Sequence, residues 1–344
     1  MAPSTMKQWS ITGTDKGFDG LEFGDVQVPK VGENDVLVKI QAASLNYRDL
    51  IIPLGRYPFP TKFPVAACSD GAGEVLEVGE RVTRFKPGDK VVTLFNQGHQ
   101  FGPVDFAAAG TGLGGVLDGT LRQFGVFNEN GLSPAPRNLG PLETATLTCA
   151  GLTAWNALYG LRPLLPGQWV LVQGTGGVSV FGLQFAKAAG ARVIATTSSA
   201  AKVETLKKLG ADHVINYVED PTWGATAKKL TGGAGVDHIL EVGGAGTLEQ
   251  SCAAIRFEGI ISVIGFLGGV KATTSALDCL NNICTFRGVY VGSRQLLEAM
   301  VACVEANDIH PVVDEKVFTL EQAKEAYQYM WDKKHFGKVA IKIE

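Results

Sequence analysis

The sequence predicts an α/β protein in which a doubly wound parallel sheet is joined to a β-rich, barrel-like domain. From Trp169 onward, strand-like and helix-like segments alternate at the spacing of parallel βαβ units. The first of these strands runs into a glycine-rich turn, GTGGVS, and then into a helix. Before Pro141, in contrast, the chain reads as β-strands separated by turns. A length of 344 residues suits about two such domains.

The N-terminal region reads as an antiparallel, barrel-like domain. Its expected strands are LEFGDVQVP, DVLVKIQAASLN, GAGEVLEVG, DKVVTLF and GTLRQFGVF. Turn signals rich in glycine, proline and asparagine separate them, such as KVGEND, FKPGDK and NENG. Residues 95–118 are glycine-rich and apolar, which is more typical of a surface lobe or loop than of regular structure.

After Pro141 the segment LETATLTCAGLTAWNALYG reads as helical. The strand–helix alternation then extends from QWVLVQG to GIISVIGF, as expected for a parallel sheet. Beyond the strand TFRGVYVGS, the sequence predicts two helices and a last strand, namely RQLLEAMVACVEAND, LEQAKEAYQYMWDK and GKVAIKI.

Composition excludes several classes of protein. The chain is 45% hydrophobic and 19% charged, so it can bury a substantial core and is not disordered. A net charge of −3 argues against a general affinity for nucleic acid or for an anionic membrane. No apolar run approaches the roughly 20 residues of a membrane span, and the N-terminus shows no secretory signal. The six cysteines are scattered without a CxxC motif, which fits a reduced, cytoplasmic setting.

The turn GTGGVS has the context that a dinucleotide fingerprint requires, since it follows a strand and opens a helix. Gly174 turns the chain, and Gly176 allows the backbone to approach a pyrophosphate at the N-terminus of the helix. Gly177 and Val178 continue this turn into the helix. Ser179 replaces the third glycine of the pattern, and its small side chain still allows close packing of helix on strand. These features predict nucleotide binding.

The end of the second strand, RVIATTSSAAK, indicates which nucleotide binds. An acidic residue about 20 positions beyond the glycine turn would bind the ribose diol of NAD, but Thr197 occupies that place. Ser198 and Lys202 follow it, and Tyr217 ends the next strand. Hydroxyl groups and a cation, with no carboxylate to repel it, suit a 2′-phosphate. We therefore expect NADP(H) rather than NAD(H).

Over nearly its whole length the sequence resembles the medium-chain dehydrogenase/reductase superfamily. The motifs that carry the resemblance are DVLVKIQAASLNYRDL, GAGEVLEVG, RFKPGDKVV, AGLTAW, VLVQGTGGVSVFGLQFAKAAGARVIAT, KKLGADHVINY and GVDHILEVGG. It looks most like the branch of quinone oxidoreductases and zinc-free enoyl reductases, which includes zinc-free proteins often labelled alcohol dehydrogenases. The resemblance implies a GroES-like catalytic domain at 1–150, completed by 293–344, and a Rossmann domain at 151–292.

The resemblance also bears on zinc. The superfamily's catalytic zinc is held by three protein ligands, usually two cysteines and a histidine, with an open position for substrate. Alignment by motif places Asn46 at the first cysteine, Ser69 at the histidine and Cys149 at the third ligand, with Asp70 where the family has a glutamate. Cys68 lies one residue away, so its side chain should face the other side of an extended segment. We therefore expect no zinc. The lobe at 95–118 contains no cysteine, so it lacks the ligands of the family's structural zinc.

Without a metal, hydrogen-bond donors must stabilise the charge that arises on the acceptor. Asn46 is expected to face the nicotinamide and could bind a carbonyl oxygen, because it occupies a ligand position. Tyr47 or Tyr57 could donate a proton or a hydrogen bond, and Tyr47 is favoured because it adjoins Asn46. Arg48 and Asp49 could form a supporting ion pair.

The resemblance implies further contacts to the cofactor. Thr153 would contact the nicotinamide, Val242 and Gly243 the ribose, and Lys338 the pyrophosphate. The carboxamide would be held near Ile264, Gly265, Phe266, Val289 and Val291. The strand TFRGVYVG lies where such proteins form homodimers, and an exposed edge strand needs such cover.

We therefore expect a zinc-independent oxidoreductase that transfers hydride from NADPH to a conjugated small-molecule acceptor, a quinone or an α,β-unsaturated carbonyl. One alternative within the same fold is an NAD(P)-linked alcohol dehydrogenase or carbonyl reductase. The other alternative is a protein that binds the cofactor without redox turnover.

Overall fold

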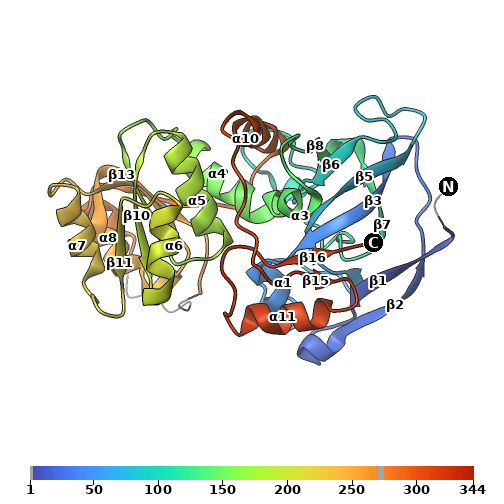
Figure 1. Ribbon diagram of the computed structural model, residues 1–344, viewed down its shortest axis with the longest axis horizontal. Coiled ribbons are helices and arrows are strands. Elements are labelled where there is room, and N and C mark those ends of the chain that lie inside the picture. The colour runs from blue at the N-terminus through green and yellow to red at the C-terminus, as the bar shows by residue number, and fades with distance from the viewer. Residues whose placement is uncertain (1–2, 268, 270–274) are drawn as a thin grey trace. The chain divides into compact units, whose positions relative to one another are not determined.

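The chain forms two compact units in a computed structural model (Figure 1). The structure describes residues 3–267, 269 and 275–344. Unit 1 comprises Met1–Leu152 and Gly292–Glu344, and unit 2 comprises Thr153–Val291. Among the described residues, no helix is long and apolar enough to cross a membrane.

Unit 1 is built around a seven-stranded sheet in which β3 is central. The strand order is β15 (Phe318–Thr319), β16 (Ala340–Lys342), β3 (Asp35–Ser44), β5 (Asp70–Val78), β6 (Lys90–Thr93) and β8 (Leu132–Pro134), and β7 (Phe124–Asn128) also pairs with β3. A three-stranded sheet of β2 (Leu21–Gln27), β1 (Thr5–Ile11) and β4 (Val65–Ala66) accompanies it. β3 is buried along most of its length because it pairs with three other strands.

Short helices connect or cover these strands. They are α1 (Tyr47–Ile51), α2 (Phe106–Ala109), α3 (Pro141–Ala145), α10 (Arg294–Ala306) and α11 (Ala323–Trp331), with 3-10 turns at Gly17–Gly20 and Glu129–Gly131. α3 continues into a π-helical turn at Leu147–Gly151. The core of unit 1 joins residues from both chain segments, such as Ile40, Leu50 and Tyr327. The C-terminal segment therefore completes the hydrophobic core of unit 1.

Unit 2 is a parallel sheet of six strands with helices around it. Its order is β11 (His213–Asn216), β10 (Arg192–Thr197), β9 (Trp169–Gln173), β12 (Val236–Glu241), β13 (Ile255–Val263) and β14 (Thr285–Gly288). Its helices are α4 (Leu152–Tyr159), α5 (Gly177–Ala188), α6 (Val203–Lys208), α7 (Trp223–Leu230), α8 (Leu248–Ala254) and α9 (Leu277–Asn281), with 3-10 turns at Ala200–Lys202 and Gly244–Gly246. This strand order is that of a doubly wound dinucleotide-binding fold.

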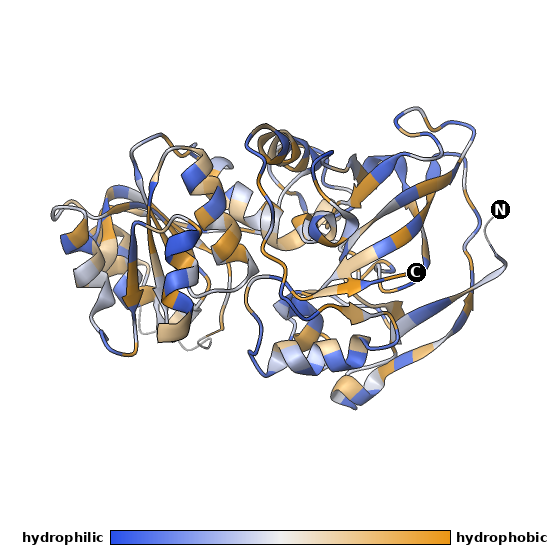
Figure 2. Ribbon diagram, viewed as in Figure 1, coloured by the Kyte–Doolittle hydropathy of each residue, from blue (hydrophilic) through white to orange (hydrophobic). Residues whose placement is uncertain are grey.

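Hydropathy explains why unit 2 adopts this form. Every residue of β9 and of β12 is buried, as expected for strands covered on both faces. Figure 2 shows apolar strands at the centre and polar residues on the outer surfaces of the helices. The predicted fold class is therefore confirmed.

Two local features differ from expectation. The strand predicted over TFRGVYVGS is shorter, because β14 ends at Gly288 and Val291 adopts a positive φ of 50°. The lobe at 95–118 is not wholly superficial, since Phe95 and Asn96 are buried at its base. Its outer part exposes Phe101 largely and Phe106 almost entirely to solvent.

Candidate active site

Three strands of unit 1 bring polar residues to one place. Ser44, at the end of β3, pairs with Asp70 at the start of β5 and with Ala340 at the start of β16. Asn46 follows β3 by two residues, and Lys338 precedes β16 by two residues. Residues far apart in the sequence therefore meet in a buried polar cluster, which contains Asn46, Arg48, Asp49, Asp70 and Lys338.

Lys338 lies inside this cluster. Its side chain is 3% exposed, and its Nζ donates to the Leu45 carbonyl and to Asn46 Oδ1, each at 2.6 Å. Nζ also lies 3.4 Å from Asp70 Oδ2. The expected role of Lys338 as a pyrophosphate-binding cation does not fit this arrangement, because the ammonium faces the interior of unit 1 and its donors are directed at these oxygens.

Arg48 and Asp49 form the ion pair that the sequence suggested. Arg48 Nη1 lies 3.3 Å from Asp49 Oδ1 and donates to the Leu113 carbonyl at 2.9 Å. The guanidinium faces the rings of Tyr57 and Phe95, at 4.9 and 4.7 Å from their centroids. This pair therefore ties α1 to the base of the lobe at 95–118.

Burial shifts both carboxyl groups of the cluster toward their neutral forms. Burial raises the pKa of Asp49 to about 6, against the opposing influence of Arg48 and of the Asn46 backbone N–H, which donates to Asp49 Oδ2 at 2.8 Å. Burial also raises the pKa of Asp70, against the influence of Lys338 and of the Asn46 amide. Two cations and two carboxyl groups thus share one desolvated volume.

The two candidate tyrosines have different surroundings. Tyr57 is half-buried, and its hydroxyl oxygen accepts a hydrogen bond from Arg48 Nε at 3.2 Å. Tyr47 opens α1, and both tyrosine rings pack against the hydrophobic core of unit 1. Through Arg48 and Asp49, Tyr57 is therefore connected to Asn46. This hydrogen bond supports Tyr57 as a candidate, whereas the sequence favoured Tyr47.

In unit 2, the glycine turn has the shape that a pyrophosphate requires. Gly174 has a φ of +75°, and its N–H donates to the Thr196 carbonyl at 2.9 Å. A Cβ added at Gly174 or at Gly176 would meet nothing within 4 Å, so the space above the turn is open. Gly177 and Val178 are the first residues of α5, whose twelve residues give a substantial N-terminal dipole. Ser179 does more than fit closely, since its Oγ donates to the Gln173 carbonyl at 2.5 Å.

A second buried network, not predicted from the sequence, lies below this turn. Its centre is Glu241 at the end of β12, which is completely buried. Its carboxylate accepts from five groups, namely the N–H groups of Gly243 and Gly244, the hydroxyls of Thr247 and Ser251, and Gln173 Nε2. Gln173 Oε1 in turn accepts from the N–H groups of Val242 and Gly243, at 3.1 and 3.2 Å. The network therefore fixes the backbone of Val242 and Gly243, which the sequence assigned to the ribose.

The residues expected near a 2′-phosphate lie around the end of β10. Lys202 Nζ donates to Thr175 Oγ1, which belongs to the glycine turn, at 3.2 Å. Thr197 is buried, its Oγ1 accepts from the Ser199 N–H at 3.1 Å, and its carbonyl accepts from the Tyr217 N–H at 3.0 Å. Ser198 and Tyr217 are exposed. Lys202 is therefore adjacent to the predicted pyrophosphate site, whereas Thr197 Oγ1 already accepts a hydrogen bond from the backbone of the turn that follows β10.

The remaining expected cofactor contacts, apart from Thr153 on α4, follow the carboxyl ends of parallel strands. Ile264, Gly265 and Phe266 come directly after β13, and Val289 and Val291 come after β14. The Ile264 N–H donates to the Glu241 carbonyl at 2.8 Å, and a Cβ at Gly265 would lie 2.6 Å from the Val242 carbonyl oxygen. Ligands of open parallel sheets bind at this edge.

Comparisons with known proteins agree with this architecture. A family described as alcohol dehydrogenase GroES-like domain matches residues 32–137, and one described as zinc-binding dehydrogenase matches residues 177–306. A zinc-type alcohol dehydrogenase-like protein of Schizosaccharomyces pombe is 50% identical over 95% of this chain and 96% of its own. The chain belongs to the medium-chain dehydrogenase/reductase superfamily. It is an oxidoreductase of a family that binds nicotinamide cofactors.

Two further relatives show the range of the superfamily. The chloroplastic quinone oxidoreductase QR1 of Triphysaria versicolor is 31% identical, and the alignment covers 99% of both chains. The solved structure of an NAD-dependent alcohol dehydrogenase is 33% identical, with a TM-score of 0.88 and coverage of 98% of this chain and 100% of the other.

The donor set at the superfamily's zinc position does not fit zinc. Asn46 Oδ1 is occupied by Lys338, and Ser69 Oγ donates to Asp70 Oδ1 at 2.9 Å. Cys149 is the one thiol among these three positions, and burial raises the pKa of that thiol to about 12. Cys68 is buried, and its Sγ donates to the Ser44 carbonyl. Across residues 3–267, 269 and 275–344, no three His, Cys, Asp or Glu side chains are grouped so that they could hold a metal ion.

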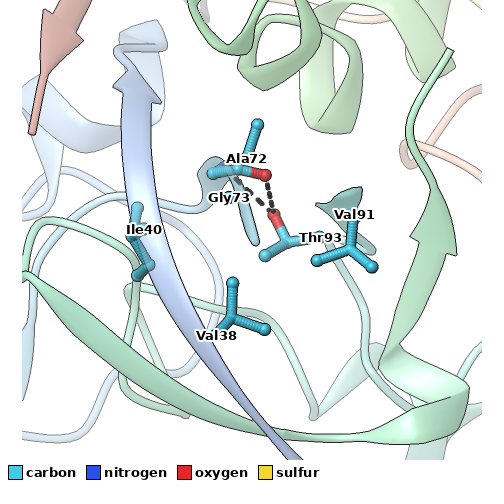
Figure 3. Close-up of a pocket in the computed structure, with 7 residues that line it drawn as sticks. Val38, Ile40, Ala72, Gly73, Val91 and Thr93 are labelled. Atoms are coloured by element: carbon cyan, nitrogen blue, oxygen red, sulfur yellow. Dashed lines mark hydrogen bonds between the residues drawn. The ribbon is translucent and has the colours of Figure 1, made fainter. Parts of the chain in front are cut away.

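Thr93, at the end of β6, is a structural part of the site that sequence analysis missed. Its Oγ1 accepts from the Gly71 N–H at 3.1 Å (Figure 3). The same oxygen lies 3.1 Å from the hydroxyl of Thr148. Thr148 belongs to the π-helical turn that also carries Cys149, and such turns are frequent at functional sites. The crevice in Figure 3, lined by apolar residues and Thr93, leaves no room for a water molecule. The start of β5, and with it Asp70, is therefore held rigidly.

Proposed function

We propose that this oxidoreductase reduces a conjugated acceptor, a quinone or an α,β-unsaturated carbonyl, with NADPH and without zinc. The observation that carries the proposal is the contact between Lys338 and Asn46, because the resemblance places Asn46 at a zinc-ligand position and its oxygen binds an ammonium group here. The quinone oxidoreductase among the relatives supports the choice of acceptor. The open glycine turn and the fixed backbone at Val242 and Gly243 support cofactor binding in unit 2.

The cofactor would supply a hydride, which is one proton and two electrons. In an enone, the new C–H bond forms at the β-carbon, and the π electrons move to the carbonyl oxygen to give an enolate. Asn46 Nδ2 would donate a hydrogen bond to that oxygen. The enolate then takes one proton at the α-carbon, so the balance is enone, hydride and proton to saturated carbonyl.

Tyr57 is the proton donor that the hydrogen bonds favour. Its oxygen accepts from Arg48 Nε, which leaves its own O–H free to point at a substrate. When the proton leaves, the guanidinium stabilises the negative charge that develops on the phenol oxygen. The Arg48–Asp49 ion pair holds this guanidinium in place.

A conjugated acceptor suits this site better than a simple alcohol. Hydrogen-bond donors stabilise a delocalised enolate or hydroquinone anion well, since the charge develops on an oxygen within their reach. Removal of hydride from an unactivated alcohol requires a localised alkoxide, for which an amide and a phenol are weaker partners than a Lewis acid.

The preference for NADPH rests on the end of β10. Thr197 stands where an acidic residue would bind the ribose of NAD, and Lys202 brings a cation to the neighbouring turn. A 2′-phosphate would find an ammonium group there and no carboxylate from β10.

The test is oxidation of NADPH and NADH by the purified protein with quinones, enals, enones and simple ketones, together with elemental analysis for zinc. We expect turnover of conjugated acceptors, a preference for NADPH, and well under one zinc per chain. Efficient oxidation of simple alcohols with indifference to every conjugated acceptor would instead establish an alcohol dehydrogenase, as the names of several relatives suggest. Tight NADPH binding without any turnover would establish a cofactor-binding protein.

We also propose that two copies pair through the outer edge of β14. This strand ends the sheet order, and the preceding segment exposes Leu277, Leu280 and Ile283. Light scattering should therefore give the mass of a dimer, and Leu280→Asp should shift it toward the monomer.

A further inference from the structure

We propose that Lys338 is the positioning residue of the active site, which holds the Asn46 amide by its oxygen and so presents the amide nitrogen to the substrate. The ammonium group would thereby take over the organising role of a metal cation. This inference rests on the proposed function, because it assigns Asn46 Nδ2 to the substrate oxygen. It replaces the pyrophosphate role that the sequence suggested for Lys338.

The backbone of Lys338 is fixed on both sides. Its N–H donates to the Val312 carbonyl at 3.0 Å, and its carbonyl accepts from the Asp314 N–H at 2.8 Å. Gly337 has a φ of +70°, and a Cβ there would lie 2.2 Å from the Val312 carbonyl oxygen. Only glycine fits this approach, so the segment delivers the lysine side chain to one place.

The three protons of the ammonium group have three oxygen partners. Two bonds are short, to the Leu45 carbonyl and to Asn46 Oδ1 at 2.6 Å, and Asp70 Oδ2 is a longer contact at 3.4 Å. Because an ammonium group has no further donor, Lys338 has none left for a substrate. It therefore acts through Asn46, which makes it a positioning residue.

The contact fixes the direction of the Asn46 amide. An amide has an acceptor end and a donor end, and Lys338 can bind only the acceptor end. Asn46 is 8% exposed, and its Nδ2 donates no hydrogen bond of ordinary geometry to any described residue. The amide lies beside Asp70, where it opposes the rise in the pKa of that carboxyl. The donor nevertheless has no partner at good geometry, and burying such a donor costs stability. Such a donor is available to an incoming oxygen.

The charge of Lys338 also strengthens this donor. Hydrogen bonds in series polarise one another, so an ammonium group at Oδ1 makes the N–H groups of the same amide better donors. Asp70 lies 3.4 Å from this ammonium group and Asp49 pairs with Arg48, so each buried cation of the cluster has a carboxyl group beside it.

The first experiment compares Lys338→Met with Lys342→Met in the full chain. Lys342 lies on β16 but is exposed and bonds to Glu344, so it is a matched control. For Lys338→Met we expect kcat with a conjugated acceptor to fall about 100-fold, as for loss of an oriented oxyanion donor. The dissociation constant for NADPH should change less than about threefold. A large loss of NADPH affinity with unchanged kcat would overturn the proposal and restore the pyrophosphate role.

The second experiment separates the two ends of the amide. Asn46→Asp keeps an acceptor for Lys338 but removes the donor, so kcat should fall about 100-fold while the melting temperature is retained. In the double variant Asn46→Asp with Lys338→Met, the buried carboxylate loses its cation. Its melting temperature should fall by roughly 5 °C or more beyond the sum of the single variants. Its kcat should be no lower than that of the worse single variant, because both changes remove one function.

These readouts distinguish the two proposals. One outcome is a non-additive fall in melting temperature for the variants at positions 46 and 338, in a protein that reduces no conjugated acceptor. It would refute the proposed function but support the contact between Asn46 and Lys338. Turnover of enones or quinones by the native chain, with additive melting temperatures and an unaffected Lys338→Met, would refute the positioning role and retain the function.

Discussion

Glu241 in unit 2 and Asp70 in unit 1 are both completely buried carboxyl groups, yet their surroundings differ. Glu241 accepts from five neutral donors, and none of the described cations pairs with it. Asp70 accepts from Ser69 and lies beside the ammonium group of Lys338. Its cluster also contains Asn46 Nδ2, a buried donor that makes no hydrogen bond of ordinary geometry among the described residues.

The difference is the one expected between a scaffold and the reacting centre that we propose. Neutral donors that saturate a carboxylate fix the surrounding backbone without introducing a second charge, and in unit 2 that backbone is the edge where a dinucleotide would bind. In unit 1, buried charges and an unsatisfied donor cost stability, and such cost is typical of functional sites. Removing Glu241 should therefore affect mainly folding, and changes in the cluster around Lys338 should affect mainly turnover.

The largest expected effect is that of Glu241→Ala. The substitution leaves five donors, three of them buried, without their acceptor, so the free energy of unfolding should fall by about 3–5 kcal/mol. Urea unfolding measures this loss. Asn46→Ala is the comparison in unit 1 and should cost only about 2 kcal/mol, because it removes one charge-assisted bond, that of Lys338, and the other end of the amide lacks a good partner. Equal losses at the two sites would erase the distinction between scaffold and reacting centre.

The sequence predicted unit 2 better than the site in unit 1, and the reason is physical. Periodicity and the turn GTGGVS are local signals, so the parallel sheet, the turn at Gly174 and the helix α5 could be recognised within one stretch of chain. The contact of Lys338 with Asn46 joins residues nearly 300 positions apart and depends on the pairing of β16 with β3. No local pattern reveals which strand becomes a neighbour of β3.

The same argument explains the network around Glu241. Gln173 and Glu241 each end a strand, and their contact follows only once β9 and β12 are known to be adjacent. With the strand order of a doubly wound sheet assumed, the two polar residues at neighbouring carboxyl ends could have been paired in advance. The Arg48–Asp49 ion pair was predictable because its members are adjacent in sequence.

His238 is a buried polar residue of unit 2 whose hydrogen bonding is less complete than that of Glu241. It lies on β12 at 2% exposure, and among the described residues its Nδ1 has no partner. Burial lowers the pKa of His238 to about 4, so between about pH 6.5 and pH 4 the unfolded chain binds a proton that the folded chain does not. The free energy of unfolding should therefore fall by about 3 kcal/mol as the pH falls through this window.

Urea unfolding at pH 7 and near pH 4.5 would measure the change in the free energy of unfolding with pH. The native chain should show this change, and His238→Leu should lose the contribution of the histidine. His310→Gln is a control of opposite sign. Glu143 raises the pKa of the exposed His310, so its stabilising contribution is present at low pH and is lost as the pH rises through the folded-state pKa. An unchanged pH profile in His238→Leu would mean that this histidine is hydrated or paired.

The two tyrosines sharpen the description of the reacting centre. Tyr57→Phe removes the hydroxyl that accepts from Arg48, and we expect kcat to fall about 100-fold if that hydroxyl delivers the proton. Tyr47→Phe should then lower kcat by less than about threefold, since its ring and its packing against the core remain. Steady-state rates with one conjugated acceptor, measured for both variants, decide between them. The reverse order of effects would return the role to Tyr47, which the sequence favoured.

The smallest expected effect is that of Lys202 on the affinity for NADPH. Lys202 is a partly accessible cation at the edge of unit 2, in contrast to the buried Lys338. Lys202 Nζ bonds to Thr175 in the glycine turn, so the ammonium group is partly engaged before any nucleotide binds. Lys202→Ala should weaken NADPH binding about 10-fold, or about 1.4 kcal/mol, because a charge-assisted contact to the 2′-phosphate is lost in a partly solvated place. NADH lacks that phosphate, so its affinity should change little, and Lys208→Ala on the exposed face of α6 should change neither. Titration of each variant with both nucleotides measures the difference. Equal losses for NADPH and NADH would place Lys202 at the pyrophosphate, next to Thr175, and would leave the choice between the two cofactors to Ser198 and Tyr217.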